Sequence, residues 1–150
     1  MSIVEKPIRV LVAGLGNMGR SHALAYHNNP GYEIVGLVNR SKPSKIAPEL
    51  EQYTIHANFM TALAELKPDL CSINTYSDSH ADYAVAAFEA GCHVFVEKPL
   101  ATTVADAQRV VTAASKAGKK LVIGYILRHH PSWITLIGEA RKLGGPMSSA

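Results

Sequence analysis

The stretch Val10–Gly19, Val-Leu-Val-Ala-Gly-Leu-Gly-Asn-Met-Gly, decides the fold of this chain. Its first residues belong to a short apolar run, Ile8–Ala13, which has the β-branched residues and the length of a buried strand. The run leads directly into a G-x-G-x-x-G pattern, and residues 18–28 then have the pattern of a helix. A strand, a glycine-rich turn and a helix in this order are typical of a dinucleotide-binding turn.

Each glycine of the pattern has a physical role in such a turn. Gly14 permits the tight turn, Gly16 lets the backbone approach a pyrophosphate, and Gly19 lets the helix pack closely on the strand. The start of the helix adds unpaired N–H groups and a partial positive charge, which favour phosphate. The alternative is a glycine-rich turn that binds nothing. We assign to the predicted cofactor site Gly14, Gly16, Asn17, Met18 and Gly19.

The composition is that of an ordinary globular domain. The chain has 150 residues, of which 47% are hydrophobic and 18% charged, and its formal net charge is +3. The one dense group of lysines, near residues 116–120, is interpreted as a solvated helix end, so no nucleic-acid partner is expected. No apolar run approaches 18 residues, and no signal peptide is recognised, so neither a membrane span nor secretion is expected. Cys71 and Cys92 lack metal-ligand spacing and are interpreted as buried thiols, which predicts a cytoplasmic protein without a metal site.

Strand and helix patterns alternate along the whole chain. Strands are predicted at residues 8–13, 33–38, 54–56, 70–74, 92–96 and 121–125. Helices are predicted at residues 18–28, 61–66, 79–90, 103–117 and 131–143, and a short helix within residues 43–53 is expected to be interrupted or restarted at Pro48. This alternation predicts an α/β fold, a doubly wound parallel sheet of the Rossmann type with strand order 3-2-1-4-5-6. Residues 1–150 are expected to form one dinucleotide-binding domain, with a sheet core at 1–125 and a trailing helix and the start of a crossing to a second domain at 126–150.

The ligand of such a sheet lies at the carboxyl ends of the strands, so the residues there are the candidates for binding. After the second strand come Asn39, Arg40 and Ser41, where an NAD site usually has an acidic residue for the ribose 2′-hydroxyl. Arg40 pairs well with a 2′-phosphate and stacks on adenine, so NADP is favoured over NAD. The alternative is that Arg40 is a solvated loop residue and the site accepts both cofactors.

Two further strand ends carry candidate residues. Thr75 and Tyr76 follow the fourth strand and are expected near the cofactor ribose, while Asp78 or Ser79 is expected to cap the next helix. His80, in the first turn of that helix, is either a structural histidine or a ligand contact.

After the fifth strand come Glu97, Lys98 and Pro99. The ammonium group of Lys98 is placed to bond a substrate hydroxyl or carbonyl and to stabilise negative charge that develops on it. A simple salt bridge at the end of the strand is the alternative.

On these residues the chain resembles the Gfo/Idh/MocA oxidoreductases, the glucose–fructose oxidoreductase and inositol dehydrogenase family. The resemblance covers nearly the whole chain and rests on Gly14-x-Gly16-x-x-Gly19, Ser79-His80, Ala90-Gly91-Cys92-His93-Val94, Glu97-Lys98-Pro99, and Gly124-Tyr125 with Arg128 and Pro131. It implies NAD(P)-dependent hydride transfer on a sugar, cyclitol or related polyol. It also implies that Lys98 contacts cofactor and substrate as the catalytic residue and that Glu97 supports it near the nicotinamide ribose. Tyr125 and Arg128 are expected on the loop that borders the substrate cavity, and Arg128 and His80 are included among the predicted cofactor contacts.

The chain departs from the family pattern in two ways. Tyr76 stands where a proline is common, and no residue here corresponds to the Asp and His that the family's second domain supplies. The resemblance therefore predicts a cofactor-binding domain that is inactive alone, in an enzyme that forms a homo-oligomer. The alternative is a stand-alone nucleotide-binding or sensing module without catalysis.

Overall fold

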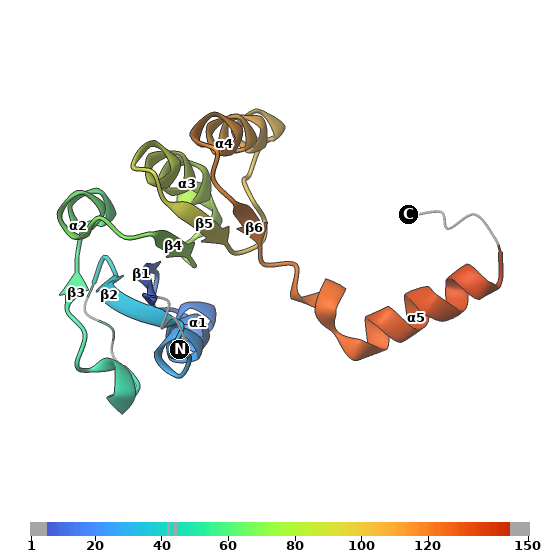
Figure 1. Cartoon of the computed structure of the whole chain (residues 1–150), viewed down its shortest axis with the longest axis horizontal. Helices are drawn as coiled ribbons and strands as arrows, with labels where there is room; N and C mark the ends of the chain where they lie inside the picture. Colours follow the sequence, from blue (N-terminus) through green and yellow to red (C-terminus); the bar gives the residue numbers. More distant parts are fainter. Residues whose placement is uncertain (1–5, 42, 44, 145–150) are drawn as a thin grey trace, which may run out of the picture.

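Six parallel strands form a single sheet with the order β3-β2-β1-β4-β5-β6 in the computed structural model, which describes residues 6–41, 43 and 45–144 (Figure 1). All five pairings between neighbouring strands are parallel. The sheet confirms the predicted fold class and strand order. The strands are β1 (Ile8–Ala13), β2 (Tyr32–Val38), β3 (Ile55–His56), β4 (Leu70–Ile73), β5 (His93–Val96) and β6 (Leu121–Ile123).

Helices lie on both faces of the sheet (Figure 1). Because side chains alternate along a strand, Leu11 and Ala13 of β1 pack on one face and Val10 and Val12 on the other. The α2, α3 and α4 helices cover the first face, and α1 covers the second. The α-helices are α1 (Asn17–His27), α2 (Phe59–Leu66), α3 (His80–Glu89), α4 (Val104–Ala117) and α5 (Pro131–Lys142), and the 3₁₀ helices are η1 (Pro48–Leu50), η2 (Ser77–Ser79) and η3 (Ile126–His129).

The short helix predicted within residues 43–53 is shorter than expected, and it begins at Pro48, where the sequence predicts an interruption or a restart. Only the three-residue 3₁₀ helix η1 forms within this range, and the rest of its described residues are irregular. Pro43 and Pro48 explain the short length, because proline has no N–H to donate and disfavours a helical conformation in the residue before it. The other predicted elements exist with bounds shifted by a few residues; α2, for example, begins two residues early because Asn58 caps it by accepting the Thr61 N–H.

Both cysteines are buried and free, as the sequence predicts. The thiol of Cys92 donates to the carbonyl of Pro68. A hydrogen bond with Cys92 and burial together raise the pKa of Cys71 well above its ordinary value, so this thiol stays protonated. Among the described residues, no helix has both the length and the apolar character needed to cross a bilayer.

The last helix does not pack on the sheet. The η3 and α5 helices leave the end of β6 and extend away from the body of the domain (Figure 1). None of the α5 residues is buried, and the predicted apolar face leaves Trp133 45% and Leu136 58% exposed. Residues 145–150, where the crossing to a second domain is expected, lie outside the described part of the chain.

Candidate functional site

The turn between β1 and α1 shows which of its glycines serve packing and which serves a ligand. Gly14 has a φ of +89°, and a Cβ added to it would lie 2.5 Å from the carbonyl oxygen of Asn74. A Cβ on Gly19 would lie 1.8 Å from the carbonyl oxygen of Gly14. A Cβ on Gly16 meets no atom of the described residues within 4 Å. The fold therefore requires Gly14 and Gly19, whereas the space beside Gly16 is open to a bound group.

Asn39 ties this turn to the end of β2. Its Oδ1 accepts the N–H of Leu15 at 3.0 Å, and its Nδ2 donates to the carbonyl of Ser41 at 2.6 Å. The side-chain amide thus links the backbone of the turn after β1 to the backbone of the loop after β2. Asn39 takes the place where an acidic residue would bind a ribose hydroxyl, and it adds no negative charge there.

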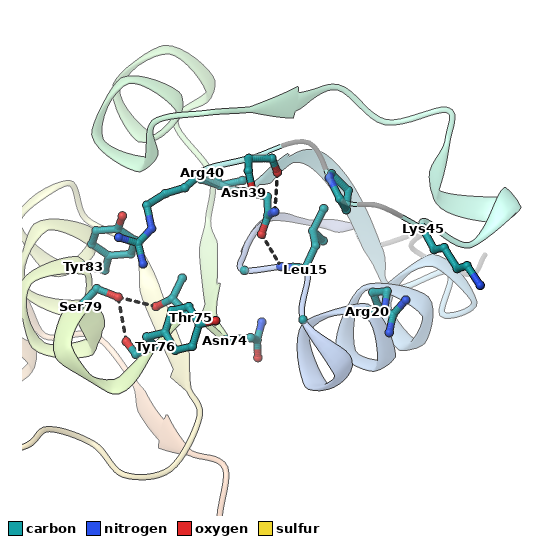
Figure 2. A pocket seen from close by; sticks show the side chains of 15 residues that line it. Leu15, Arg20, Asn39, Arg40, Lys45, Asn74, Thr75, Tyr76, Ser79 and Tyr83 are labelled. Atoms are coloured by element: carbon teal, nitrogen blue, oxygen red, sulfur yellow. Dashed lines mark hydrogen bonds between the residues drawn. The ribbon is translucent and has the colours of Figure 1, made fainter.

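A cleft of about 430 Å³ opens at this edge of the sheet, a size in the usual range for small-molecule sites (Figure 2). It brings together seven residues predicted to bind the cofactor: Gly14, Gly16, Asn39, Arg40, Ser41, Thr75 and Tyr76. The lining also includes residues that the sequence reasoning missed, among them Arg20, Lys45, Asn74, Ser79 and Tyr83. The other predicted site residues do not line it; these are Asn17, Met18, Gly19, His80, Glu97, Lys98 and Arg128.

The charge lining this cleft is of one sign. Arg20 from α1, Arg40 after β2 and Lys45 further along the same loop contribute three cations, and the lining among the described residues contains no carboxylate (Figure 2). Arg20 donates to Asn17 Oδ1 at 2.8 Å, which keeps this side chain beside the start of α1. Such a wall favours a polyanion. The sequence signals for Arg20 and Lys45 were their positions, in the first turns of the phosphate helix and in the loop after β2.

Arg40 reaches across the cleft toward the loop after β4 (Figure 2). Its guanidinium carbon lies 5.9 Å from the ring centroid of Tyr76, within the range of a cation–π contact. Tyr76 itself is 75% exposed. The two planar groups lie together in the lining of the cleft, and each offers a face on which a flat base could stack.

Asn74 presents an acceptor without a partner. Its Nδ2 donates to the carbonyl and to the hydroxyl of Ser72, at 3.2 and 3.1 Å. Its Oδ1 is buried and has no hydrogen-bond partner among the described residues. A buried acceptor of this kind favours a donor supplied by a ligand, such as a hydroxyl. The position of Asn74 directly after β4, at the carboxyl end of the strand, was the sequence feature that could have identified it as a site residue.

The wall on the α3 side is held by hydroxyl groups and one histidine. Ser79 holds the N-cap position of α3, one of the two predicted for it, but its side chain does not cap the helix: Oγ lies 2.7 Å from Thr75 Oγ1 and donates to the Tyr76 carbonyl at 2.8 Å. His80 is buried, with Nδ1 2.7 Å from the carbonyl oxygen of Pro99 and Nε2 3.1 Å from that of Thr75. Of the two roles open to His80, this geometry favours the structural one.

A second group of polar residues lies at the end of β5. Glu97 is only 7% exposed; its Oε1 lies 2.9 Å from His22 Nε2, and its Oε2 accepts the N–H of Lys98 at 3.2 Å. Among the described residues Glu97 forms no salt bridge with the ammonium group of Lys98, which removes the alternative of a simple strand-end ion pair. Arg128, in η3, is exposed and lies 5.9 Å from the ring centroid of Tyr125.

These residues together fit a dinucleotide. The open space at Gly16 suits a pyrophosphate, and α1 begins there without an acidic residue in its first turn. The cations suit the adenosine end, and the carboxyl ends of β1, β2 and β4 meet there, as expected of a nucleotide-binding sheet.

Comparisons with known proteins agree with this geometry. Residues 8–125 match the GFO_IDH_MocA family model, described as "Oxidoreductase family, NAD-binding Rossmann fold". The chain is 32% identical over 144 residues to the inositol 2-dehydrogenase of Salmonella typhimurium, covering 91% of this chain and 43% of that protein. It is 32% identical over 127 residues to a 4-carboxy-2-hydroxymuconate-6-semialdehyde dehydrogenase of a Sphingobium species, covering 83% of this chain and 40% of that protein.

A solved structure is similar as well. The WlbA dehydrogenase of Bordetella pertussis, in complex with NADH and UDP-GlcNAcA, superposes with a TM-score of 0.76 at 25% identity. The match covers 93% of this chain and 43% of that one. The chain thus spans less than half the length of the relatives that it matches.

Proposed function

The chain belongs to the Gfo/Idh/MocA family of oxidoreductases with an NAD-binding Rossmann fold, and from this membership we propose that it forms the cofactor-binding part of a dehydrogenase. The proposed substrate is a sugar, cyclitol or related polyol, as the inositol 2-dehydrogenase relative indicates. The observation that carries the proposal is the cleft itself, which lies at the carboxyl edge of the sheet. Its lining contains three cations, an open glycine turn and a buried acceptor that has no partner among the described residues.

The cofactor that we propose is NADP in preference to NAD. Arg40, directly after β2, supplies positive charge where a 2′-phosphate would lie, and Asn39 replaces the acidic residue that would repel it, while Arg20 and Lys45 add positive charge elsewhere in the cleft lining. Charge-assisted contacts of this kind contribute about 1.5–3 kcal/mol each, so they outweigh the neutral contacts to a ribose hydroxyl.

Lys98 is the proposed catalytic residue. The bound nicotinamide supplies the acceptor or donor of a hydride. The Lys98 side chain is exposed and its ammonium is unpaired with any carboxylate of the described chain, so it is available to bond the substrate oxygen and stabilise negative charge on it. Contacts of Glu97, His80 and Arg128 with the cofactor stay predictions from the family resemblance.

Turnover, in this proposal, needs more than these 150 residues. Hydride transfer requires a substrate held within about 3–3.5 Å of the cofactor and a base for its proton. The relatives are more than twice as long as the matched region, so we place the remaining substrate contacts and the base in the portion without a counterpart here. Assembly as a homo-oligomer and a location in the cytoplasm complete the proposal.

The test is a fluorescence titration of the chain with NADPH and with NADH, followed by an assay for reduction of NADP with inositol and glucose. We expect tighter binding of NADPH, by roughly ten- to a hundredfold, and no turnover. Tighter binding of NADH would overturn the cofactor assignment. Turnover by the 150-residue chain would overturn the assignment of the base to another part of the enzyme.

A further inference from the structure

One contact joins the two ends of the site and is explained by neither phosphate binding nor the family motif. His22 lies on α1, the helix that starts at the phosphate turn, and it meets Glu97 directly before the proposed catalytic lysine. We propose that His22 is a positioning residue, which clamps the Glu97 carboxylate and thereby fixes the backbone of Lys98. The inference rests on the proposed function only in the role that it gives to Lys98.

Both oxygens of the Glu97 carboxylate have a defined partner. Oε1 is 2.9 Å from His22 Nε2, and Oε2 accepts the backbone N–H of Lys98. A carboxylate can only accept, so the proton of the first contact belongs to Nε2. Since Glu97 is only 7% exposed, loss of either partner would leave a buried charge poorly compensated.

The surroundings keep the carboxylate in this orientation. The His22 ring packs on Phe95, with centroids 4.8 Å apart, so the imidazole itself is held. On the other side, a Cβ on Gly124 would lie 3.0 Å from Glu97 Oε1 and 3.1 Å from Oε2. The carboxylate is therefore enclosed between the α1 histidine and the chain just after β6. The carboxylate accepts the backbone N–H of Lys98 and forms no ion pair with the Lys98 ammonium group among the described residues.

This arrangement links the phosphate turn to the lysine turn. The residues in contact are 75 positions apart in the sequence, and α1 carries both the phosphate-facing start and His22. A ligand that orders the start of α1 would act on the same helix that holds Glu97. Through Glu97, the contact thus holds the backbone of Lys98 in a fixed position relative to the start of α1, where the pyrophosphate is expected.

Amide hydrogen exchange of Lys98, measured by NMR on the chain without cofactor, tests the proposal. In His22→Leu the exchange of the Lys98 amide should accelerate roughly tenfold or more, because the carboxylate that accepts its proton is released. In His22→Gln, which keeps an N–H donor, exchange should stay within about threefold of the original chain. His27→Leu is the matched control: it removes a histidine on the same helix that bonds the Tyr53 hydroxyl, and it should leave Lys98 unchanged.

Unchanged exchange at Lys98 in a folded His22→Leu chain, or equal acceleration in His27→Leu, would overturn the proposal. If His22→Leu does not fold, His22→Asn takes its place, because its amide is polar but too short to reach Glu97. The original chain gives an independent check, since ¹⁵N-edited spectra must show a proton on Nε2 of His22; an unprotonated Nε2 would contradict the clamp. None of these readouts involves NADPH, so the clamp and the proposed cofactor can fail separately.

Discussion

The sheet and the η3–α5 segment use the same kinds of apolar residue with opposite results. Residues 10–13 of β1 are completely buried, whereas no residue of α5 is buried. Both segments have a clear apolar pattern, so the difference does not lie in the local sequence. Periodicity predicts an element and its apolar face, but only the neighbouring elements decide whether that face is covered.

The largest effect on stability is expected where the packed sheet meets α1, at Gly19. Gly19→Ala places a Cβ where the Gly14 carbonyl already lies, so β1 and α1 must move apart. We expect the free energy of unfolding to fall by about 3 kcal/mol or more, measured by urea denaturation. Gly16→Ala is the matched control in the same turn, and it should leave stability nearly unchanged because its Cβ meets open space. Equal stability of the two variants would show that the close packing at Gly19 is not limiting.

The second prediction separates packing from binding within the same turn. Gly16→Val fills the open space beside the start of α1, so it should abolish binding of NADPH and NADH while the chain stays folded. Fluorescence titration measures the binding, and far-UV circular dichroism checks the fold. Binding at near-original affinity would place the pyrophosphate elsewhere.

The third prediction concerns the open, charged side of the cleft. Arg40→Ala should lower the affinity for NADPH by roughly ten- to a hundredfold and change the affinity for NADH by no more than a few fold, because only the 2′-phosphate loses a charged partner. Arg109→Ala is the control, since it removes the same charge from an exposed ion pair on α4, away from the cleft. Equal losses of affinity for both cofactors would indicate that Arg40 stacks on the base and does not bind the 2′-phosphate.

The smallest effect on stability is expected at the uncovered segment. Trp133→Ser combined with Leu136→Ser should change the free energy of unfolding by less than about 0.5 kcal/mol per site, because neither side chain is buried. The same pair should weaken self-association, which we expect this apolar face to drive, as measured by light scattering. Val104→Ser, at an exposed apolar residue on α4, is the control and should leave association unchanged. A chain that is monomeric before mutation would contradict this expectation.

Much of the fold could be predicted because its signals are local. The β1 strand, the glycine turn and the start of α1 follow one another within a dozen residues, and the alternation of strands and helices determines a parallel sheet. The shortness of the helix within residues 43–53 has a local cause too, since Pro43 and Pro48 limit it to the turn that begins at Pro48. The structure places Arg40 and Tyr76 in the lining of one cleft and Lys98 and Arg128 outside it, and the role of each residue stays a prediction.

The sequence by itself therefore determined the fold class, the strand order and the position of the glycine-rich turn between β1 and α1, because each depends on patterns within one or two neighbouring elements. Only the tertiary structure decided which polar groups meet. It brought Lys45 and Arg20 into the lining of one cleft, left Asn74 Oδ1 without a partner in the described part of the chain, and placed His22 against Glu97, 75 residues away in the sequence. The physical reason is that hydrogen bonds and charge pairs depend on ångström distances between elements, and these follow from strand register and helix packing rather than from spacing along the chain.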